Sequence, residues 1–201
     1  SNVKRLDDCL VLEILNSKIM NNLDFSIFKR FKECGTGYLR GGRLQEYIYE
    51  GKRGILITTS DILKDAPDNR PQEDESIYGK TLFIDYETKD YMVFSKGHRN
   101  AQGLFVQGDK IFSTEHGPYG GDEINRITIN GNYGWPKASY GESYSNKRDY
   151  LKSHEKNGFE EPIHVFVPSI GISEIIILPN SFHKKWQNNA IVTSLADKSI
   201  Y

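Results

Sequence analysis

Short apolar runs separated by polar turns extend along most of the chain. In the first third, these runs cover residues 9–15, 25–31, 43–49 and 54–59. The last two flank Glu50-Gly51-Lys52-Arg53, a tight glycine turn of the kind that joins the strands of a β-hairpin. All four runs are short enough for strands, although periodicity alone also allows one helical turn in the first two.

The same alternation continues to the end of the chain. Further strand-like runs cover residues 81–86, 90–94, 103–106, 110–114, 123–129, 163–167, 172–178 and 190–195. The run at 123–129 alternates at period two and precedes Asn130-Gly131, a dipeptide that favours a hairpin turn. Polar segments at 64–76 and 140–159 predict solvated loops, and residues 181–187 are compatible with one helical turn.

This pattern predicts an all-β protein. Short strands at 8–12-residue spacing are typical of a sandwich, a barrel or a propeller. Composition favours sheet over helix, because Ala, the best helix former, occurs only 5 times, whereas Ile occurs 21 times beside 12 Tyr and 10 Phe.

Charge and cysteine content exclude several classes of protein. The chain has 26 Lys and Arg against 27 Asp and Glu, so its formal net charge of -1 would recruit neither nucleic acid nor an anionic membrane. No apolar run approaches the roughly 18 residues of a transmembrane helix, and no signal peptide is visible at the start of the sequence. The two cysteines, Cys9 and Cys34, are compatible with one disulfide or two free thiols, and they lack zinc-ligand spacing.

Three blocks of the sequence contain more glycine, asparagine and charge than folding requires. They are residues 97–103 (GHRNAQG), 113–125 (STEHGPYGGDEIN) and 131–136 (GNYGWP). Glycine lets backbone carbonyls approach a ligand, and Asp122-Glu123 supplies hard oxygen donors. These blocks predict a site for a cation or a polar ligand at the strand ends. The alternative is a set of tight turns whose polar side chains satisfy one another.

Together the three blocks closely resemble the signature of the soluble glucose/sorbosone dehydrogenase family. The family consists of pyrroloquinoline-quinone-dependent aldose dehydrogenases with a six-bladed β-propeller fold. The match is strongest from Gly97 to Pro136, and three motifs in order at the right spacing make it specific. The resemblance implies an aldose or other carbohydrate as ligand and a periplasmic or secreted location.

The resemblance also assigns residues to the quinone site. Arg99 and Asn100 match the pair that contacts the quinone, and Arg99 would neutralise charge as the quinone is reduced. The backbone carbonyls of Gly117 and Pro118 match ligands of the calcium ion that polarises the quinone as a Lewis acid.

A second, structural calcium site is implied as well. Glu123 matches a ligand of that site, together with Asp122 and the carbonyl of Tyr133. In the family chemistry, a histidine base takes the proton of the sugar's anomeric hydroxyl while hydride passes to the quinone.

Two positions depart from the family pattern. Leu39 stands where the family has its catalytic base, and Ala196 stands where it has a cofactor-binding lysine. Arg40 or His98 near the first position, or Lys198 near the second, are the alternatives. We therefore expect a degenerate sugar-dehydrogenase-like propeller that binds calcium and a carbohydrate or protein partner. An active quinone-dependent aldose dehydrogenase is the alternative, and a plain interaction scaffold without a ligand is a third possibility.

Length limits how much of a propeller the chain can form. A blade takes roughly 40–50 residues, so 201 residues correspond to about half of a six-bladed ring. We expect residues 1–201 to form a single partial β-propeller domain that is truncated or completed by another chain. Open blade edges leave N–H and C=O groups unpaired, which predicts self-association or pairing with a complementing chain.

Overall fold

The computed structural model describes residues 2–6, 9–19, 22–35, 41–61, 69–144, 149–196 and 198–201 of the chain. Within these ranges it contains fourteen strands and only two helical segments, the three-residue 3-10 helices Arg70–Gln72 and Glu155–Asn157. The predicted all-β class is therefore confirmed.

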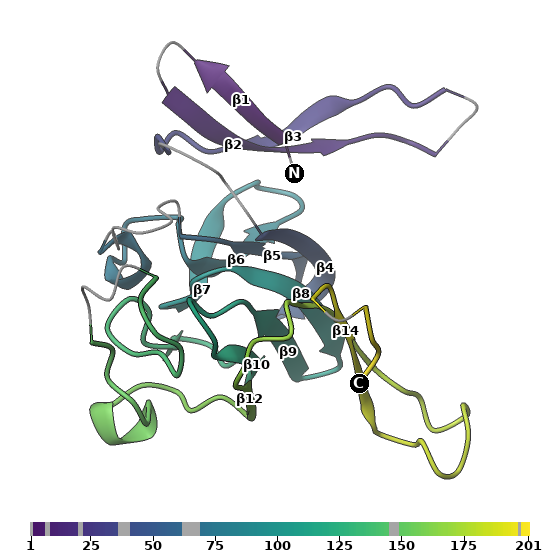
Figure 1. Ribbon diagram of the computed structural model, residues 1–201. Coiled ribbons are helices and arrows are strands. Elements are labelled where there is room, and N and C mark those ends of the chain that lie inside the picture. The colour runs from purple at the N-terminus through teal and green to yellow at the C-terminus, as the bar shows by residue number, and fades with distance from the viewer. Residues whose placement is uncertain are drawn as a thin grey trace.

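The strands form four sheets, which Figure 1 shows in chain order. The N-terminal sheet contains β1 (Asn2–Leu6), β2 (Cys9–Asn16) and β3 (Ser26–Arg30). The next sheet has the order β11 (Gly131–Asn132), β7 (Tyr91–Lys96), β6 (Lys80–Asp85), β5 (Lys52–Thr59) and β4 (Gly41–Tyr49). The third has the order β12 (His164–Phe166), β10 (Asp122–Arg126), β9 (Lys110–Glu115) and β8 (Ala101–Gln107). The last pairs β13 (Ile172–Ile177) with β14 (Ala190–Ser194).

Three successive sheets meet along their first strands, as the blades of a propeller do. Arg43 on β4 donates from Nε to the carbonyl of Gln102 on β8 (3.1 Å) and forms an ion pair with Glu174 on β13 (2.8 Å). The sheets β4–β7 and β8–β10 are antiparallel meanders that β11 and β12 extend at their outer edges. This arrangement confirms the predicted propeller blades.

The apolar runs are continuous because the middle sheets are buried on both faces. On β5, Ile55 and Ile57 point toward the N-terminal sheet, whereas Leu56 packs with Phe83 against the next blade. A third apolar layer, centred on Ile172, Ile175 and Val192, fills the space beyond the β8–β12 sheet. A strand with two buried faces needs apolar residues at successive positions, which explains the runs in the sequence.

The N-terminal sheet is attached to the β4–β7 blade through aromatic side chains. Phe28 meets Tyr86 edge-on with ring centroids 5.9 Å apart, and Phe31 meets Tyr91 at 5.0 Å. The ammonium group of Lys89 lies 3.9 Å from the ring centroid of Phe28, which adds a cation–π contact. Cys34, just after this sheet, is disulfide-bonded.

Several local predictions were wrong. Asn130-Gly131 forms a tight turn, but the turn leads into β11, which pairs parallel to β7 instead of closing a hairpin. Residues 181–187 form hydrogen-bonded turns rather than a helical one, and β1 was not predicted because its sequence lacks an apolar run. The loop predicted at 140–159 is not simply solvated, since His154 is only 1% exposed.

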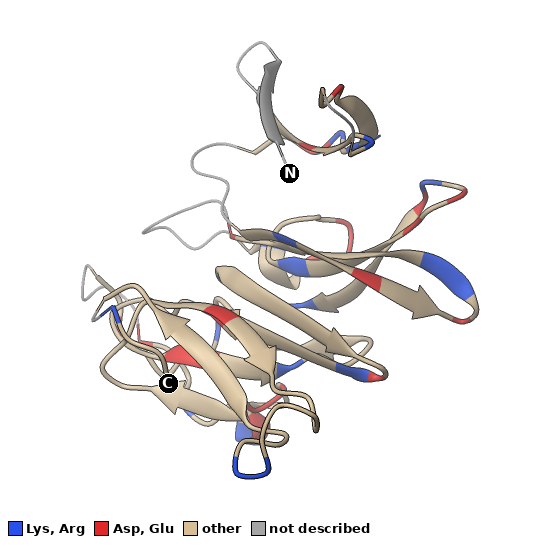
Figure 2. Cartoon of the chain, turned by 90° about the vertical axis from the view of Figure 1, so that its right-hand side faces the viewer, with Lys and Arg blue, Asp and Glu red and all other residues tan. Residues whose placement is uncertain are grey.

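Charged groups are distributed over the whole molecule. Figure 2 shows both signs scattered along the described strands and turns in this view. This distribution agrees with the near-neutral net charge of -1. Among the described residues, no helix is long and apolar enough to cross a membrane.

Candidate functional site

The three glycine-rich blocks lie at one end of the blades. There β5 ends at Thr59, which pairs with Gly41, and β8 begins at Ala101, which pairs with Glu115 at the end of β9. Glu115 in turn pairs with Glu123 on β10. Strand pairing therefore brings residues far apart in the sequence to one edge of two adjacent sheets.

Arg99 is the residue that connects the three blocks. Its Nη1 donates to the carbonyls of His116 (2.9 Å) and Gly117 (2.5 Å), which links the first block to the second. The guanidinium lies 5.3 Å from the ring of Trp135, in the third block, and 6.0 Å from that of Tyr144. A cation held between aromatic rings and carbonyls is well placed to receive an anionic ligand with its remaining N–H groups.

Asp61 belongs to the same site, although sequence reasoning did not single it out. Its backbone N–H donates to the carbonyl of Arg99 (2.7 Å), and its carboxylate accepts from the indole Nε1 of Trp135 (2.7 Å). The residue is 8% exposed. The signal available in the sequence was the change from the apolar core of β5 to the polar run Thr58-Thr59-Ser60-Asp61.

Asn100 is held rigidly beside Arg99. Its side-chain oxygen accepts from Nε2 of Gln102 (2.7 Å), and its carbonyl accepts from the backbone N–H of His116 (3.1 Å). The carboxamide oxygen keeps one lone pair, so a ligand can be contacted from that lone pair or from the carboxamide nitrogen.

The carbonyls of Gly117 and Pro118 already have protein donors. The first accepts from Arg99, and the second accepts from the hydroxyl of Tyr144 (3.2 Å). Each carbonyl oxygen has two lone pairs, so one acceptor site on each remains for a metal ion. The positive charge of Arg99 beside Gly117 opposes a cation there unless a bound anion compensates for it.

Asp122 connects two neighbouring blades through hydrogen bonds. Its Oδ1 accepts from Ser169 Oγ (2.8 Å) and from the backbone N–H of Gly117 (3.2 Å), and its Oδ2 accepts from the N–H of Ile172 (2.9 Å). Three of the four lone pairs of the carboxylate thus accept from the chain, and one on Oδ2 remains. The main role of Asp122 in this arrangement is to connect the turn at Gly117 with the next blade.

Glu123 is buried with its charge poorly compensated. The nearest nitrogen of His154 is 3.7 Å from its carboxylate, and Asn125 Nδ2 donates to it over 3.3 Å. Burial, with a contribution from the charge of Glu115, raises the pKa of Glu123 well above its ordinary value. Burial also lowers the pKa of His154, which disfavours the imidazolium that would neutralise the carboxylate.

Two buried polar atoms beside Glu123 have no hydrogen-bond partner. They are Oδ1 of Asn125 and Nδ1 of His154. Buried polar atoms are rarely left unpaired, and an unneutralised carboxylate beside a vacant amide oxygen suits a hard cation with oxygen ligands. The residues around Glu123 therefore fit a calcium ion.

Tyr133 can contribute only its backbone to such a site. Its ring is stacked on His98 with centroids 4.6 Å apart, and its hydroxyl donates to the carbonyl of Arg126 (2.5 Å). Burial raises the pKa of this hydroxyl to about 12. Within the described ranges, no three His, Cys, Asp or Glu side chains group as metal ligands, so carbonyls or water would have to complete any calcium shell.

Ala196 and Leu39 are the two positions at which the sequence departs from the pattern of the family that it resembles. Ala196 follows β14, and its N–H donates to the carbonyl of Ile170 (3.0 Å). Its methyl group has no charge to offer a cofactor. Leu39 and the neighbouring Arg40 lie outside the described residues.

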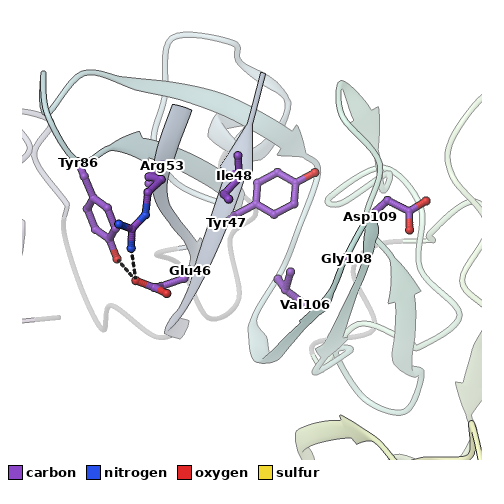
Figure 3. Close-up of a pocket in the computed structure, with 9 residues that line it drawn as sticks. Glu46, Tyr47, Ile48, Arg53, Tyr86, Val106, Gly108 and Asp109 are labelled. Carbon is purple, nitrogen blue, oxygen red and sulfur yellow. Dashed lines mark hydrogen bonds and ion pairs between the residues drawn. The ribbon is translucent and has the colours of Figure 1, made fainter. Parts of the chain in front are cut away.

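A separate pocket of about 560 Å³ opens at the opposite end of the same blades. Figure 3 shows that its polar groups do not converge. Glu46 accepts a hydrogen bond from the Tyr86 hydroxyl and forms an ion pair with Arg53 on one side of β4. Tyr47 points to the other side of β4, where Val106 lies. A site needs polar groups directed at a common point, and this pocket lacks them.

Known proteins resemble the chain along most of its length. The sequence model of the glucose/sorbosone dehydrogenase family matches residues 26–201. The aldose sugar dehydrogenase YliI of Escherichia coli (strain K12) is 28% identical over 205 residues, which cover 92% of this chain and 53% of that protein.

Solved structures give the same result for the fold. The apo-form of the soluble aldose sugar dehydrogenase from Escherichia coli matches with a TM-score of 0.80 at 24% identity, over 98% of this chain and 62% of that one. The PQQ-bound form of an aldose sugar dehydrogenase from Streptomyces coelicolor matches with a TM-score of 0.63 at 21% identity, over 96% and 53%. The chain thus spans between 53% and 62% of the length of these relatives.

Proposed function

Since the chain belongs to the glucose/sorbosone dehydrogenase family, we propose that residues 1–201 form one partial β-propeller domain that binds calcium and a carbohydrate and has lost most of the family's oxidation chemistry. The observation that supports a binding site is the convergence on Arg99, where two carbonyls, two aromatic rings and Asp61 meet. The observation that supports the loss is the residue type at Leu39 and Ala196.

Arg99 and Asn100 would hold a quinone cofactor of the kind named for the Streptomyces coelicolor relative. The guanidinium offers charge-assisted hydrogen bonds to an anionic group, and Asn100 adds an amide donor. The carbonyls of Gly117 and Pro118 would hold a calcium ion beside it. When bound, the quinone accepts hydride and the calcium ion polarises it.

The second calcium ion would bind at Glu123, with the carbonyl of Tyr133 and the side-chain oxygen of Asn125 as further ligands. This part of the proposal is supported by the buried carboxylate of Glu123 and the unpartnered Asn125 Oδ1. Because three of the four lone pairs of Asp122 accept from the chain, we expect Asp122 mainly to hold the turn at Gly117 in place and to offer calcium at most one lone pair of Oδ2.

A leucine at position 39 cannot accept the proton of a sugar hydroxyl. Loss of a general base typically slows a reaction by about 10²–10⁴-fold. An alanine at position 196 also removes a cation from the cofactor's surroundings. We therefore expect ligand binding with little turnover.

A working dehydrogenase is the second candidate, and Asp61 is the observation in its favour. Its carboxylate lies at the site, bonded to Trp135 and connected through the backbone to Arg99. A carboxylate in that position can serve as proton acceptor in place of the missing imidazole. In that case Asp61→Asn would abolish turnover and leave quinone binding intact.

The first experiment measures turnover. Purified protein is loaded with pyrroloquinoline quinone and Ca²⁺, and dye reduction is followed with a panel of aldoses. We expect little turnover in the native sequence and a gain of about 10²-fold in Leu39→His, which supplies an imidazole. Turnover of the native protein at ordinary enzyme rates, on the order of 10 per second, would refute the degenerate function and favour the second candidate.

The second experiment measures calcium binding through stability. A ligand that binds only the folded state stabilises it by about 2.7 kcal/mol at 100 times its dissociation constant. We expect Ca²⁺ to raise the melting temperature of the native protein and to leave that of Glu123→Ala unchanged. If Ca²⁺ shifts neither protein, the proposed metal sites are wrong and a scaffold without a metal remains.

Partners and compartment are also part of the proposal. An aldose or another carbohydrate is the expected ligand, and open blade edges are the expected surface for self-association or for a complementing chain. The disulfide at Cys34 supports a periplasmic or secreted location, because disulfides persist in oxidising compartments.

A further inference from the structure

Three buried side chains form a hydrogen-bonded row beneath Arg99. Ser95 Oγ lies 2.8 Å from Nε2 of His98, and Nδ1 of His98 lies 3.0 Å from Oε2 of Glu115. The exposed fractions are 1% for Ser95, 0% for His98 and 4% for Glu115. Such a row resembles a hydrolase triad, but a nucleophile this deeply buried cannot reach a substrate.

The hydrogen-bond pattern determines which nitrogen of His98 carries the proton. A carboxylate only accepts hydrogen bonds, so the nitrogen that faces Glu115 must be protonated. Nδ1 therefore donates to Glu115, and in the neutral ring Nε2 accepts from the hydroxyl of Ser95. The ring is also stacked on Tyr133, which leaves it no freedom to turn.

Glu115 uses its other oxygen on the backbone of Arg99. Its Oε1 accepts from the Arg99 N–H over 2.7 Å, and the Arg99 carbonyl accepts from Asp61 on the opposite side. Both peptide groups of Arg99 are therefore fixed. From this fixed backbone the guanidinium reaches the carbonyls of His116 and Gly117.

We propose that His98 and Glu115 are positioning residues that together aim Arg99 at the ligand site. Glu115 accepts a hydrogen bond from the Arg99 N–H, and His98 forms a hydrogen bond with Glu115. The ring of His98 is itself fixed by its hydrogen bond with Ser95 and its stacking on Tyr133. That Arg99 contacts the quinone rests on the proposed function. The hydrogen-bonded row and its effect on the Arg99 backbone do not.

The first test determines the protonated nitrogen of His98 by long-range ¹H–¹⁵N correlation in ¹⁵N-labelled protein, with His98→Asn to assign its signals. We expect the proton on Nδ1. In Glu115→Gln the amide oxygen can still accept from Arg99, while the amide NH₂ must donate to Nδ1 of His98. The proton should then move to Nε2. A native ring without a proton on Nδ1 would overturn the proposal.

The second test measures hydrogen exchange of the Arg99 amide. Glu115→Ala removes its acceptor, and we expect exchange to become at least 10-fold faster. The amide of His98 is an internal control, because it donates to the carbonyl of Gly79 (3.0 Å) and should keep its rate. An unchanged Arg99 rate in a folded Glu115→Ala protein would overturn the proposal. Should that variant fail to fold, the proton position in Glu115→Gln still decides.

The third test separates positioning from stability. Quinone affinity, followed by the cofactor's absorbance, should fall at least 10-fold in Glu115→Ala and less than about 3-fold in Glu115→Gln. Glu13→Ala is the matched control, because Glu13 is equally buried at 4% exposure but pairs with Arg30 in the N-terminal sheet. It should lower the melting temperature without changing quinone affinity.

The outcomes distinguish this inference from the proposed function. If the native protein binds the quinone and Glu115→Ala binds it equally well, the positioning role is wrong. If the native protein binds no quinone, the proposed function fails, and the proton position and Arg99 exchange still decide whether His98 and Glu115 fix the Arg99 backbone.

Discussion

The two ends of the same strands bury side chains of opposite character. At the site end, the strands finish in buried polar groups such as His98, Glu115 and Glu123. At the other end, Tyr47 and Tyr49 meet Phe83 and Phe94 edge-on, with ring centroids between 5.7 and 6.4 Å apart. One end is held by hydrogen bonds, and the other by aromatic packing.

The difference between the two ends identifies the site. Burying a polar group costs free energy unless a partner compensates for it. A cluster of buried polar groups, some of them unpaired, therefore indicates a ligand site. At the site end, His98 and Glu115 have hydrogen-bond partners within the chain, whereas Asn125 Oδ1 and His154 Nδ1 beside Glu123 have none. The exposed polar groups at the opposite end are solvated and need no ligand.

Phe83→Ala should have the largest effect on stability. Phe83 is 4% exposed and packs between two tyrosines, and removing a buried phenyl ring typically costs about 3–5 kcal/mol. Urea unfolding measures the loss. Below the melting transition, we expect calcium and quinone affinities to be unchanged. A change in either affinity at full folding would mean that the two ends are coupled, and Phe83→Leu gives a milder version of the same test.

Two glycines with positive φ provide a matched pair across the molecule. At Gly97 (φ +77°) a Cβ would collide with the side-chain oxygen of Asn132, whereas at Gly108 (φ +61°) a Cβ would have no atom within 4 Å. Gly108→Ala should cost about 1–2 kcal/mol from backbone strain alone. Gly97→Ala should cost about 2–4 kcal/mol, because overpacking is added. Equal losses in urea unfolding would show that the site end is no tighter than the other.

Lys80 tests the cost of a charge buried at the site end. It is fully buried, its Nζ donates to the carbonyls of Arg70 (2.6 Å) and Tyr78 (2.8 Å), and burial lowers its pKa from 10.5 to about 8. Between these values the unfolded chain binds more protons than the folded one, so stability rises with pH. We expect a gain of about 2 kcal/mol between pH 7.5 and pH 9.5 relative to Lys80→Met.

Urea unfolding at pH 7.5 and pH 9.5 measures that gain. The comparison with Lys80→Met cancels the contribution of tyrosines, which titrate at higher pH in both proteins. Lys110→Met, at an exposed position, is the control and should retain the pH dependence of the native protein. An identical pH dependence in Lys80→Met would show that the buried ammonium carries no penalty.

The sequence was sufficient to predict most strands and the three site blocks. Runs such as Leu82-Phe83-Ile84 are apolar at every position because both sheet faces are buried, and their length indicates strands. The blocks were visible because Gly, Asn and paired charges are unusual at this density between strands. The order of the strands in the two sheets explains why these three blocks lie close together.

Other features depend on contacts that the sequence does not display. Asp61 follows an ordinary strand, and only the approach of Trp135, 74 residues later, makes it part of the site. His154 lies in a polar segment that predicts exposure, yet it is buried against Glu123. The carboxylate of Asp122 accepts hydrogen bonds from Ser169 and Ile172 of the next blade. Because these contacts are not visible in the sequence, the sequence alone does not distinguish this carboxylate from that of a metal ligand.

The smallest effect is expected at the pocket in Figure 3. Glu46 and Arg53 are 3.7 Å apart, and their side chains are 72% and 71% exposed. Exposed ion pairs of this kind contribute little because water and salt screen them, so Glu46→Gln should change the free energy of unfolding by less than about 0.5 kcal/mol. It should also leave calcium and quinone binding unchanged. A larger loss of stability, or any loss of binding, would mean that this pocket has a role that its diverging side chains do not indicate, and the contrast between the two ends would have to be abandoned.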